Sequence, residues 1–251
     1  MHQPDLKYNE ARDQFELGGE LFFCDMRGPK DRRKSDDDGF TMVKNEIYLK
    51  SYLDMLEIRP KSIFEVGFFE GGSSVFLDQL FMPDQLTCVD IRKDRLTSVD
   101  HYIDRRKRAD NFRMIYGMDQ RDIEGLGALV DKHHSGTLDL VIDDASHMYE
   151  LSRVTFSALF PRLRPGGLYI LEDYAWAHHP AYQSQQHPWY SHPALTNLIF
   201  EAMLMMSSGG IVSRVDVRPG LCIIERGHHN CPCPLVIEDQ MRLRGRTLTQ
   251  I

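Results

Sequence analysis

Short apolar runs alternate with longer segments of helical spacing along most of this chain. The apolar runs have the length of buried strands, and they lie at residues 63–66, at a stretch that ends in Asp90, and at residues 112–116, 138–142 and 168–171. Helical patterns occupy residues 41–56, 93–109, 149–163 and 194–208, a segment opened by Ser73 and Ser74, and another that ends near His134. Strands that alternate with helices predict a mostly parallel sheet with helices on both faces, a Rossmann-like α/β fold.

A hairpin is expected to close this sheet. Residues 212–217 and 222–226 have strand patterns, and the Pro219-Gly220 pair between them is a turn signal. The hairpin adds an antiparallel strand to the sheet. We predict one domain over residues 41–227 and a tail over residues 228–251.

Residues 1–40 are predicted to form an N-terminal extension. They contain a weak helical pattern at residues 10–17 and, at residues 27–39, a basic block that runs into an acidic one. We expect the charged block to be a solvated or disordered loop. The alternative is a lid over an active site, and both descriptions hold if the loop orders on ligand binding.

Composition restricts the class of protein. The 251 residues fit one large α/β domain with or without an appendage, and the 42% apolar fraction is enough for a core. A net charge of -7 with scattered Lys and Arg argues against a nucleic-acid partner. No apolar run approaches the roughly 20 residues of a membrane helix, and no signal pattern is present. The odd number of cysteines, five, favours a reducing compartment, so we expect a cytoplasmic protein.

A glycine turn lies at the centre of the chain, within residues 62–90. Gly67, Gly71 and Gly72 follow the first predicted strand, and Asp90 ends the next one about 20 residues later. Glycines let a ligand approach the backbone, a carboxylate at that distance suits a ribose diol, and Ser73 or Ser74 could cap the helix. The turn therefore predicts a nucleoside cofactor.

The type of nucleoside cofactor depends on two side chains. Phe69 stands where a phosphate-binding turn needs its second glycine, so a pyrophosphate fits poorly. Glu65 suits a ligand with an ammonium group, such as the amino-acid end of S-adenosylmethionine. The alternatives are a nicotinamide dinucleotide, which would make the protein an oxidoreductase, and an ordinary turn that binds nothing.

Carboxylates gather after two later strands. Asp143 and Asp144 begin the sequence DDASH, which ends in His147, and Glu172 and Asp173 follow the next strand. Ligands of open α/β sheets bind beyond the carboxyl ends of the strands, so these residues are expected to share one edge. Crowded carboxylates need a proton or a cation, and oxygen ligands favour Mg²⁺. An imidazole beside such an ion could deprotonate a hydroxyl.

Simpler roles are open for the same residues. Asp144 or Ser146 could cap the following helix, and Glu172 or Asp173 could simply end a strand. The sequence HHNCPCP at residues 228–234 has two His and two Cys, but its cysteines are only one residue apart. Structural zinc sites use wider spacing, so we expect a polar loop there.

Several of these motifs together resemble one family. Residues 65–74, Asp90 and residues 117–120, 143–147 and 164–173 are similar to class I S-adenosylmethionine-dependent methyltransferases. The similarity is narrower with the metal-dependent branch of macrocin and mycinamicin sugar O-methyltransferases and cephalosporin-hydroxylase-like proteins. The strings DDASH and LRPGGLYILED carry it, and it covers roughly residues 41–226. It implies a seven-stranded methyltransferase sheet.

The resemblance also implies roles by position. The implied Mg²⁺ ligands are Asp144, Glu172 and Asp173, and the implied general base is His147. Implied cofactor-binding residues are Glu65, Gly67, Gly71 and Ser73 in the turn, Asp90 at the ribose, Asp119 and Gln120 near the adenine, and Asp143 near the methionine end. Ala145 departs from the family, which usually has Gly there, and this change can shift the loop that carries His147.

The expected function is Mg²⁺-dependent transfer of a methyl group from S-adenosylmethionine to a hydroxyl of a small molecule with adjacent oxygens. A sugar in natural-product (antibiotic) biosynthesis is the expected acceptor, and a catechol-type phenol is the nearest alternative. The other alternative is a biosynthetic enzyme or binding protein of the same fold that transfers no methyl group. Residues 174–190 are rich in aromatic and His side chains and are expected to line the acceptor pocket. Neither a membrane nor a nucleic acid is expected as a partner, and homo-oligomerisation is left open.

Overall fold

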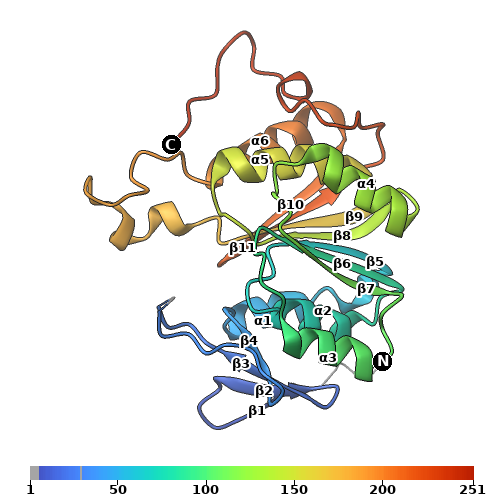
Figure 1. Ribbon diagram of the computed structural model, residues 1–251. Coiled ribbons are helices and arrows are strands. Elements are labelled where there is room, and N and C mark those ends of the chain that lie inside the picture. Colours follow the sequence, from blue (N-terminus) through green and yellow to red (C-terminus); the bar gives the residue numbers. More distant parts are fainter. Residues whose placement is uncertain (1–5, 29) are drawn as a thin grey trace. The chain divides into compact units, whose positions relative to one another are not determined.

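A mostly parallel sheet of seven strands dominates the computed structural model, which describes residues 6–28 and 30–251 (Figure 1). In sheet order, its strands are β10 (Val212–Arg218), β11 (Leu221–Arg226), β9 (Leu163–Glu172), β8 (Leu138–Asp143), β5 (Ser62–Val66), β6 (Gln85–Asp90) and β7 (Phe112–Tyr116). The pairs β5–β6, β6–β7 and β8–β9 are parallel, whereas β11 is antiparallel to β9 and β10. The predicted α/β fold with an antiparallel closing hairpin is confirmed.

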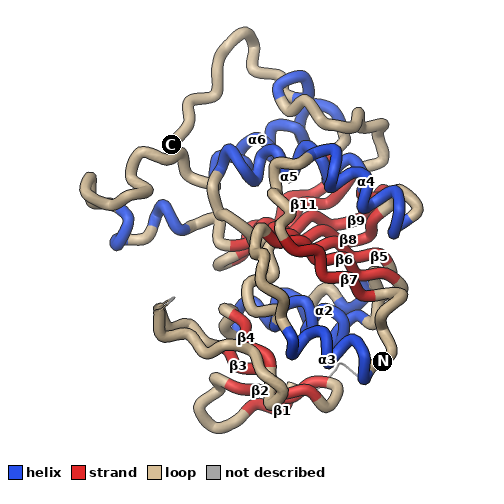
Figure 2. Tube along the Cα trace, viewed as in Figure 1, coloured by secondary structure: helices blue, strands red, loops and turns tan. Residues whose placement is uncertain are grey.

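The chain divides into two compact units, one up to Met118 and one from Asp119 on. The first contains β5–β7, three helices and a small second sheet (Figure 2). Its helices are α1 (Glu46–Leu53), α2 (Gly72–Phe81) and α3 (Thr97–Arg105), with a 3-10 turn η1 (Leu56–Ile58). The small sheet has the order β1 (Lys7–Tyr8), β2 (Gln14–Leu17), β3 (Glu20–Cys24) and β4 (Phe40–Met42).

Part of the N-terminal extension is therefore β structure, and the predicted helical pattern at residues 10–17 is wrong. Phe15 and Leu17 are buried while Glu16 between them is exposed, which is the period of two of a strand. The Phe76 ring of α2 packs edge-on against the rings of Phe15 and Phe22 at 5.9 and 6.1 Å. This aromatic packing joins the small sheet to the core. It is made between residues far apart in the chain, so the local sequence pattern does not indicate it.

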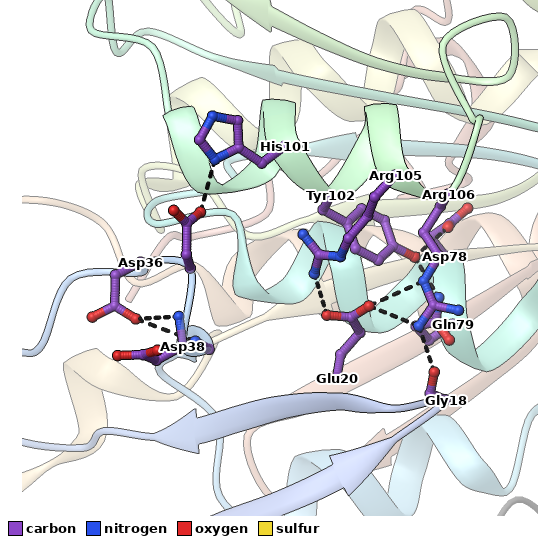
Figure 3. Close-up of polar contacts among 12 residues, drawn as sticks. Gly18, Glu20, Asp36, Asp38, Asp78, Gln79, His101, Tyr102, Arg105 and Arg106 are labelled. Atoms are coloured by element: carbon purple, nitrogen blue, oxygen red, sulfur yellow. Dashed lines mark hydrogen bonds and ion pairs between the residues drawn. The ribbon is translucent and has the colours of Figure 1, made fainter.

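Ion pairs join the small sheet to α3 (Figure 3). Glu20 of β3 is 7% exposed and accepts hydrogen bonds from both Arg105 and Arg106, with an Arg106 Nη2–Oε1 distance of 2.7 Å. Beside this pair, the Tyr102 hydroxyl donates to the Asp78 Oδ2 of α2 at 2.6 Å. A buried carboxylate shared by two guanidinium groups is well compensated for its lost hydration.

The second unit contains β8–β11 with helices α4 (Ile123–His134), α5 (Tyr149–Leu159) and α6 (Thr196–Gly209). Its 3-10 turns are η2 (Phe160–Arg162), η3 (Trp176–His178), η4 (Pro180–Tyr182) and η5 (Glu238–Gln240). The helix predicted over residues 149–163 ends at Leu159 because Pro161 lies in the 3-10 turn that follows. None of the described helices is both long and apolar enough to cross a membrane.

The turn predicted at residues 164–167 lies inside a strand instead. Leu138 pairs with Leu163 and Leu140 with Leu168, so β9 has extra residues opposite Asp139. Gly166 takes a positive φ of 77° in this irregular stretch, which glycine tolerates. The Pro-Gly-Gly sequence thus produces a bulge-like irregularity, after which β9 continues to Glu172.

Candidate active site

The glycine turn after β5 follows a backbone path that requires glycine at several positions. Gly67 and Gly71 have φ angles of 88° and 78°, in the left-handed region that glycine favours. A Cβ at Gly71 would lie 2.5 Å from Val99 Cγ2, and one at Gly72 would lie 2.2 Å from the carbonyl oxygen of Thr41. Packing within the protein therefore requires glycine at positions 71 and 72, whether or not a ligand binds at the turn.

Gly71 is the residue that caps α2, so the prediction of a Ser73 or Ser74 cap is wrong. The helix begins at Gly72, and no side chain in the described part of the protein caps it. Ser74 instead donates a short hydrogen bond to Oε2 of Glu65 on β5. The serines thus connect the helix to the carboxylate rather than to its own backbone amides.

Glu65 is completely buried, and burial raises the pKa of its carboxyl, with the Ser73 and Ser74 hydroxyls partly offsetting the rise. Its second oxygen, Oε1, is buried and has no hydrogen-bond partner among the described residues. A buried carboxylate oxygen without a donor suits a cationic ligand group. The contact of Glu65 with an ammonium stays a prediction.

Asp90 at the end of β6 ties the glycine turn together. Its Oδ2 accepts hydrogen bonds from the amides of Phe68 (2.9 Å) and Phe69 (3.1 Å), and its Oδ1 accepts one from the amide of Arg92 (2.8 Å). Phe69 has a φ of 48°, which these bonds help to hold. Sequence reasoning assigned Asp90 to a ribose and missed this structural role; the ribose contact stays a prediction.

Asp119 and Gln120, predicted near the adenine, have different surroundings. Asp119 pairs with Arg121 at 2.6 Å, and this hydrogen bond lowers the pKa of its carboxyl. Gln120 is buried, and its Nε2 donates to Thr155 Oγ1 of α5 at 3.0 Å. Gln120 therefore packs the α5 helix, and its contact with an adenine stays a prediction.

Asp143, the last residue of β8, is 2% exposed. Tyr169 donates its hydroxyl to Oδ2 at 2.8 Å, and Oδ1 has no hydrogen-bond partner in the described part of the chain. Burial raises the pKa of this carboxyl to about 6, a change that the Tyr169 hydroxyl partly opposes. Like Glu65, Asp143 presents a buried acceptor oxygen.

Asp144, His147 and Asp173 form a cluster in which one ligand atom of each lies within 4.8 Å of the others. The His147 Nε2 is 3.8 Å from Asp173 Oδ2. Two carboxylates and an imidazole at this spacing could hold a divalent cation, or could place a base beside one. Glu172, the third predicted ligand, is 1% exposed at the end of β9 and is not in the cluster.

His147 and Asp173 both have positive φ angles, of 57° and 51°. Such conformations cost a non-glycine residue about 1–3 kcal/mol and concentrate at functional sites. The cluster therefore lies on two loops whose backbone is held in sparsely populated conformations. The sequence placed these residues together but contained no signal of the strain.

An aromatic insert, residues 174–195, connects β9 to α6. The Trp176 ring packs against Tyr182 and Trp189 with centroid distances of 5.3 and 5.1 Å. The Trp176 Nε1 donates a hydrogen bond to the carbonyl oxygen of His147 at 2.6 Å. Sequence analysis noted the aromatic residues but had no motif that could indicate this bond.

Comparison with known proteins shows similarity to methyltransferases. Residues 64–174 match the family described as a methyltransferase domain. Over 70 residues (28% of this chain, 17% of the relative), the chain is 45% identical to mycinamicin VI 2''-O-methyltransferase of Micromonospora griseorubida. Over 65 residues (26% and 17%), it is 48% identical to 8-demethyl-8-alpha-L-rhamnosyl tetracenomycin-C 2'-O-methyltransferase of Streptomyces olivaceus. The alignments thus span about a sixth of the length of these relatives.

Among solved structures, the MycE methyltransferase from the mycinamycin biosynthetic pathway, in complex with Mg and SAH, is similar with a TM-score of 0.54 and 25% identity. The match covers 72% of this chain and 49% of that one. Residues 64–174 therefore resemble a methyltransferase domain of the class that uses S-adenosylmethionine. The resemblance to the sugar O-methyltransferase branch is confirmed by these relatives.

Proposed function

We propose that this protein is an Mg²⁺-dependent O-methyltransferase that methylates a hydroxyl of a small molecule with adjacent oxygens, a sugar of a natural product. The cluster of Asp144, His147 and Asp173 within a methyltransferase domain is the observation that carries the proposal. Sugar methylation is supported by relatives that are O-methyltransferases of mycinamicin VI, demethylmacrocin and a rhamnosyl tetracenomycin-C. A cytoplasmic location belongs to the same proposal.

The residues present fit both groups that the proposal requires. Glu65 Oε1 and Asp143 Oδ1 are buried acceptors without a donor among the described residues, which suits the ammonium of S-adenosylmethionine. Asp144 and Asp173 offer the hard oxygen ligands that Mg²⁺ prefers, and Glu172 is the third ligand that the sequence predicts. We assign the remaining cofactor contacts to Gly67, Gly71, Ser73, Asp90, Asp119 and Gln120.

In the proposed reaction, His147 Nε2 accepts the proton of the acceptor hydroxyl. The freed oxygen lone pair forms the new O–CH₃ bond while the S–CH₃ bond breaks, and S-adenosylhomocysteine leaves. A bound Mg²⁺ would supply positive charge that makes the hydroxyl more acidic. The chain's own contribution is to hold the two reactants in line and to take the proton.

A calorimetric titration followed by a transfer assay tests the proposal. We expect S-adenosylmethionine to bind with or without chelator, NAD to give no heat, and radioactive methyl transfer to sugar diols to require Mg²⁺. Transfer that persists in EDTA would refute the metal dependence. Tight cofactor binding without a methylated product from any sugar or catechol would support the alternative, a biosynthetic enzyme of the same fold that transfers no methyl group.

A further inference from the structure

One hydrogen bond joins the aromatic insert to the loop that carries the proposed base. The indole Nε1 of Trp176 donates to the carbonyl oxygen of His147 at 2.6 Å, across 29 residues of sequence. The backbone amide of Trp176 also donates to the carbonyl oxygen of Asp173, at 3.5 Å. Trp176 therefore contacts both loops of the cluster, the one after β8 and the one after β9.

The Trp176 side chain is buried among aromatic rings. It is 9% exposed and packs edge-on against the Tyr182 and Trp189 rings. Tyr182 and Trp189 stack on each other at 5.7 Å, so the three rings form one cluster. A rigid indole is a precise donor, because little rotamer freedom is left to lose when its N–H is bonded.

His147, whose carbonyl oxygen accepts this hydrogen bond, has an unfavourable backbone conformation. His147 has a φ of 57°, a conformation that persists in a non-glycine residue only where the surroundings impose it. Loss of a residue that orients a metal-binding side chain costs about 10–100-fold in metal affinity or activity. The bond to the His147 carbonyl holds the backbone from which the imidazole projects toward Asp173.

We propose that Trp176 is a positioning residue, whose indole N–H holds the His147 loop against the Asp173 loop so that the cluster is formed before the metal and acceptor bind. This inference rests on the proposed function of the cluster. It assigns the insert a role beyond lining a pocket, because Trp176 of the insert acts on His147 through one hydrogen bond.

The test uses Trp176→Phe, which keeps an aromatic ring and removes the donor, and Trp189→Phe as the matched control. Trp189 belongs to the same ring cluster, and the described residues show no hydrogen bond from it to His147. The chain contains two tryptophans, so each variant assigns one of two indole signals in a ¹⁵N spectrum. In the metal-free wild type, we expect the Trp176 indole proton to exchange with solvent more slowly than that of Trp189.

Metal binding and turnover give the second readout. We expect Trp176→Phe to weaken Mn²⁺ or Mg²⁺ binding about tenfold and to lower kcat about tenfold. The KM for S-adenosylmethionine should stay within about twofold and the melting temperature close to that of Trp189→Phe, which should bind metal normally. Equal metal affinity in the two variants, or equally fast exchange of both indoles, would overturn the proposal. A wild type that binds no divalent ion would instead refute the proposed function, and the exchange rates would still decide whether the bond exists.

Discussion

The carboxylate of Asp90 accepts hydrogen bonds from the backbone amides of both Phe68 and Phe69. A side chain at the end of β6 thus holds the glycine turn that follows the neighbouring strand, β5. Asp90 thereby acts on the cofactor site before any ribose is present. A third bond, from the amide of Arg92, fixes the orientation of the carboxylate. Its removal should therefore affect stability and cofactor binding together.

We expect Asp90→Ala to lower the free energy of unfolding by about 2–3 kcal/mol, since it removes charge-assisted hydrogen bonds. Binding of S-adenosylmethionine should weaken at least about tenfold. Urea unfolding and calorimetry measure the two effects. Asp94→Ala, on the exposed loop nearby, is the control, and equal unfolding curves for the two variants would contradict the structural role.

Substitution at Gly72 tests the packing of the turn. An alanine Cβ there would collide with the Thr41 carbonyl oxygen, so we expect Gly72→Ala to destabilise the protein by about 2 kcal/mol or more. A Cβ at Gly28 would meet nothing within 4 Å, and Gly28 has no positive φ, so Gly28→Ala should be close to neutral. Thermal melts of the two variants compare them, and similar melting temperatures would argue against a tight turn.

The buried Asp143 makes stability depend on pH. Its pKa is raised from an ordinary 3.8 to about 6, so the folded state favours the protonated form. This preference stabilises the folded protein fully below about pH 4, and the stabilisation is lost as the pH rises through 6. A rise of this size corresponds to about 3 kcal/mol between the two protonation states.

Asp143→Asn should therefore stabilise the protein at pH 8 by up to about 3 kcal/mol and change little near pH 4. Urea unfolding in EDTA, without cofactor, measures the difference at each pH. A pH-independent effect of the substitution would show that the carboxyl ionises normally in the folded protein. Binding of S-adenosylmethionine should weaken in the same variant, because it removes the carboxylate that we assign to the methionine end of the cofactor.

Substitutions in the cluster of Asp144, His147 and Asp173 should affect turnover without affecting cofactor binding. Asp144→Asn and His147→Ala should each lower kcat at least about 100-fold while S-adenosylmethionine still binds. Asp144→Asn should also lose Mg²⁺ affinity, whereas His147→Ala should keep most of it if the imidazole acts as a base. Wild-type turnover by His147→Ala would refute that assignment, and a total loss of Mg²⁺ binding would make His147 a ligand.

The sequence predicted the elements whose apolar residues are continuous and local. Residues 63–66 and 138–142 are strands as expected, because a buried parallel strand is apolar throughout. The strand at Gln14–Leu17 was missed because its partner, the Phe76 ring, lies far along the chain. Sequence patterns report local periodicity, and this strand depends on tertiary packing.

The candidate site could likewise be predicted from the sequence only in part. Asp144, His147 and Asp173 follow two strands whose carboxyl ends share an edge, so their meeting could be predicted from topology alone. The position of Glu172 outside that cluster could not, because it depends on where β9 ends: Glu172 is the last residue of the strand and is buried, whereas Asp173 lies beyond the strand and reaches the His147 loop. The bond from Trp176 to His147 has no signature in the sequence, since it depends on the fold of the insert.

The small sheet also determines how this protein can be shortened. The family match begins at residue 64, yet Phe15 and Phe22 cover the Phe76 face of α2, and Glu20 neutralises two arginines of α3. A fragment that starts at the family boundary would expose an aromatic helix face and leave two cations without their shared carboxylate. Such a fragment would tend to aggregate, so the smallest useful expression unit includes the strands that precede the methyltransferase segment.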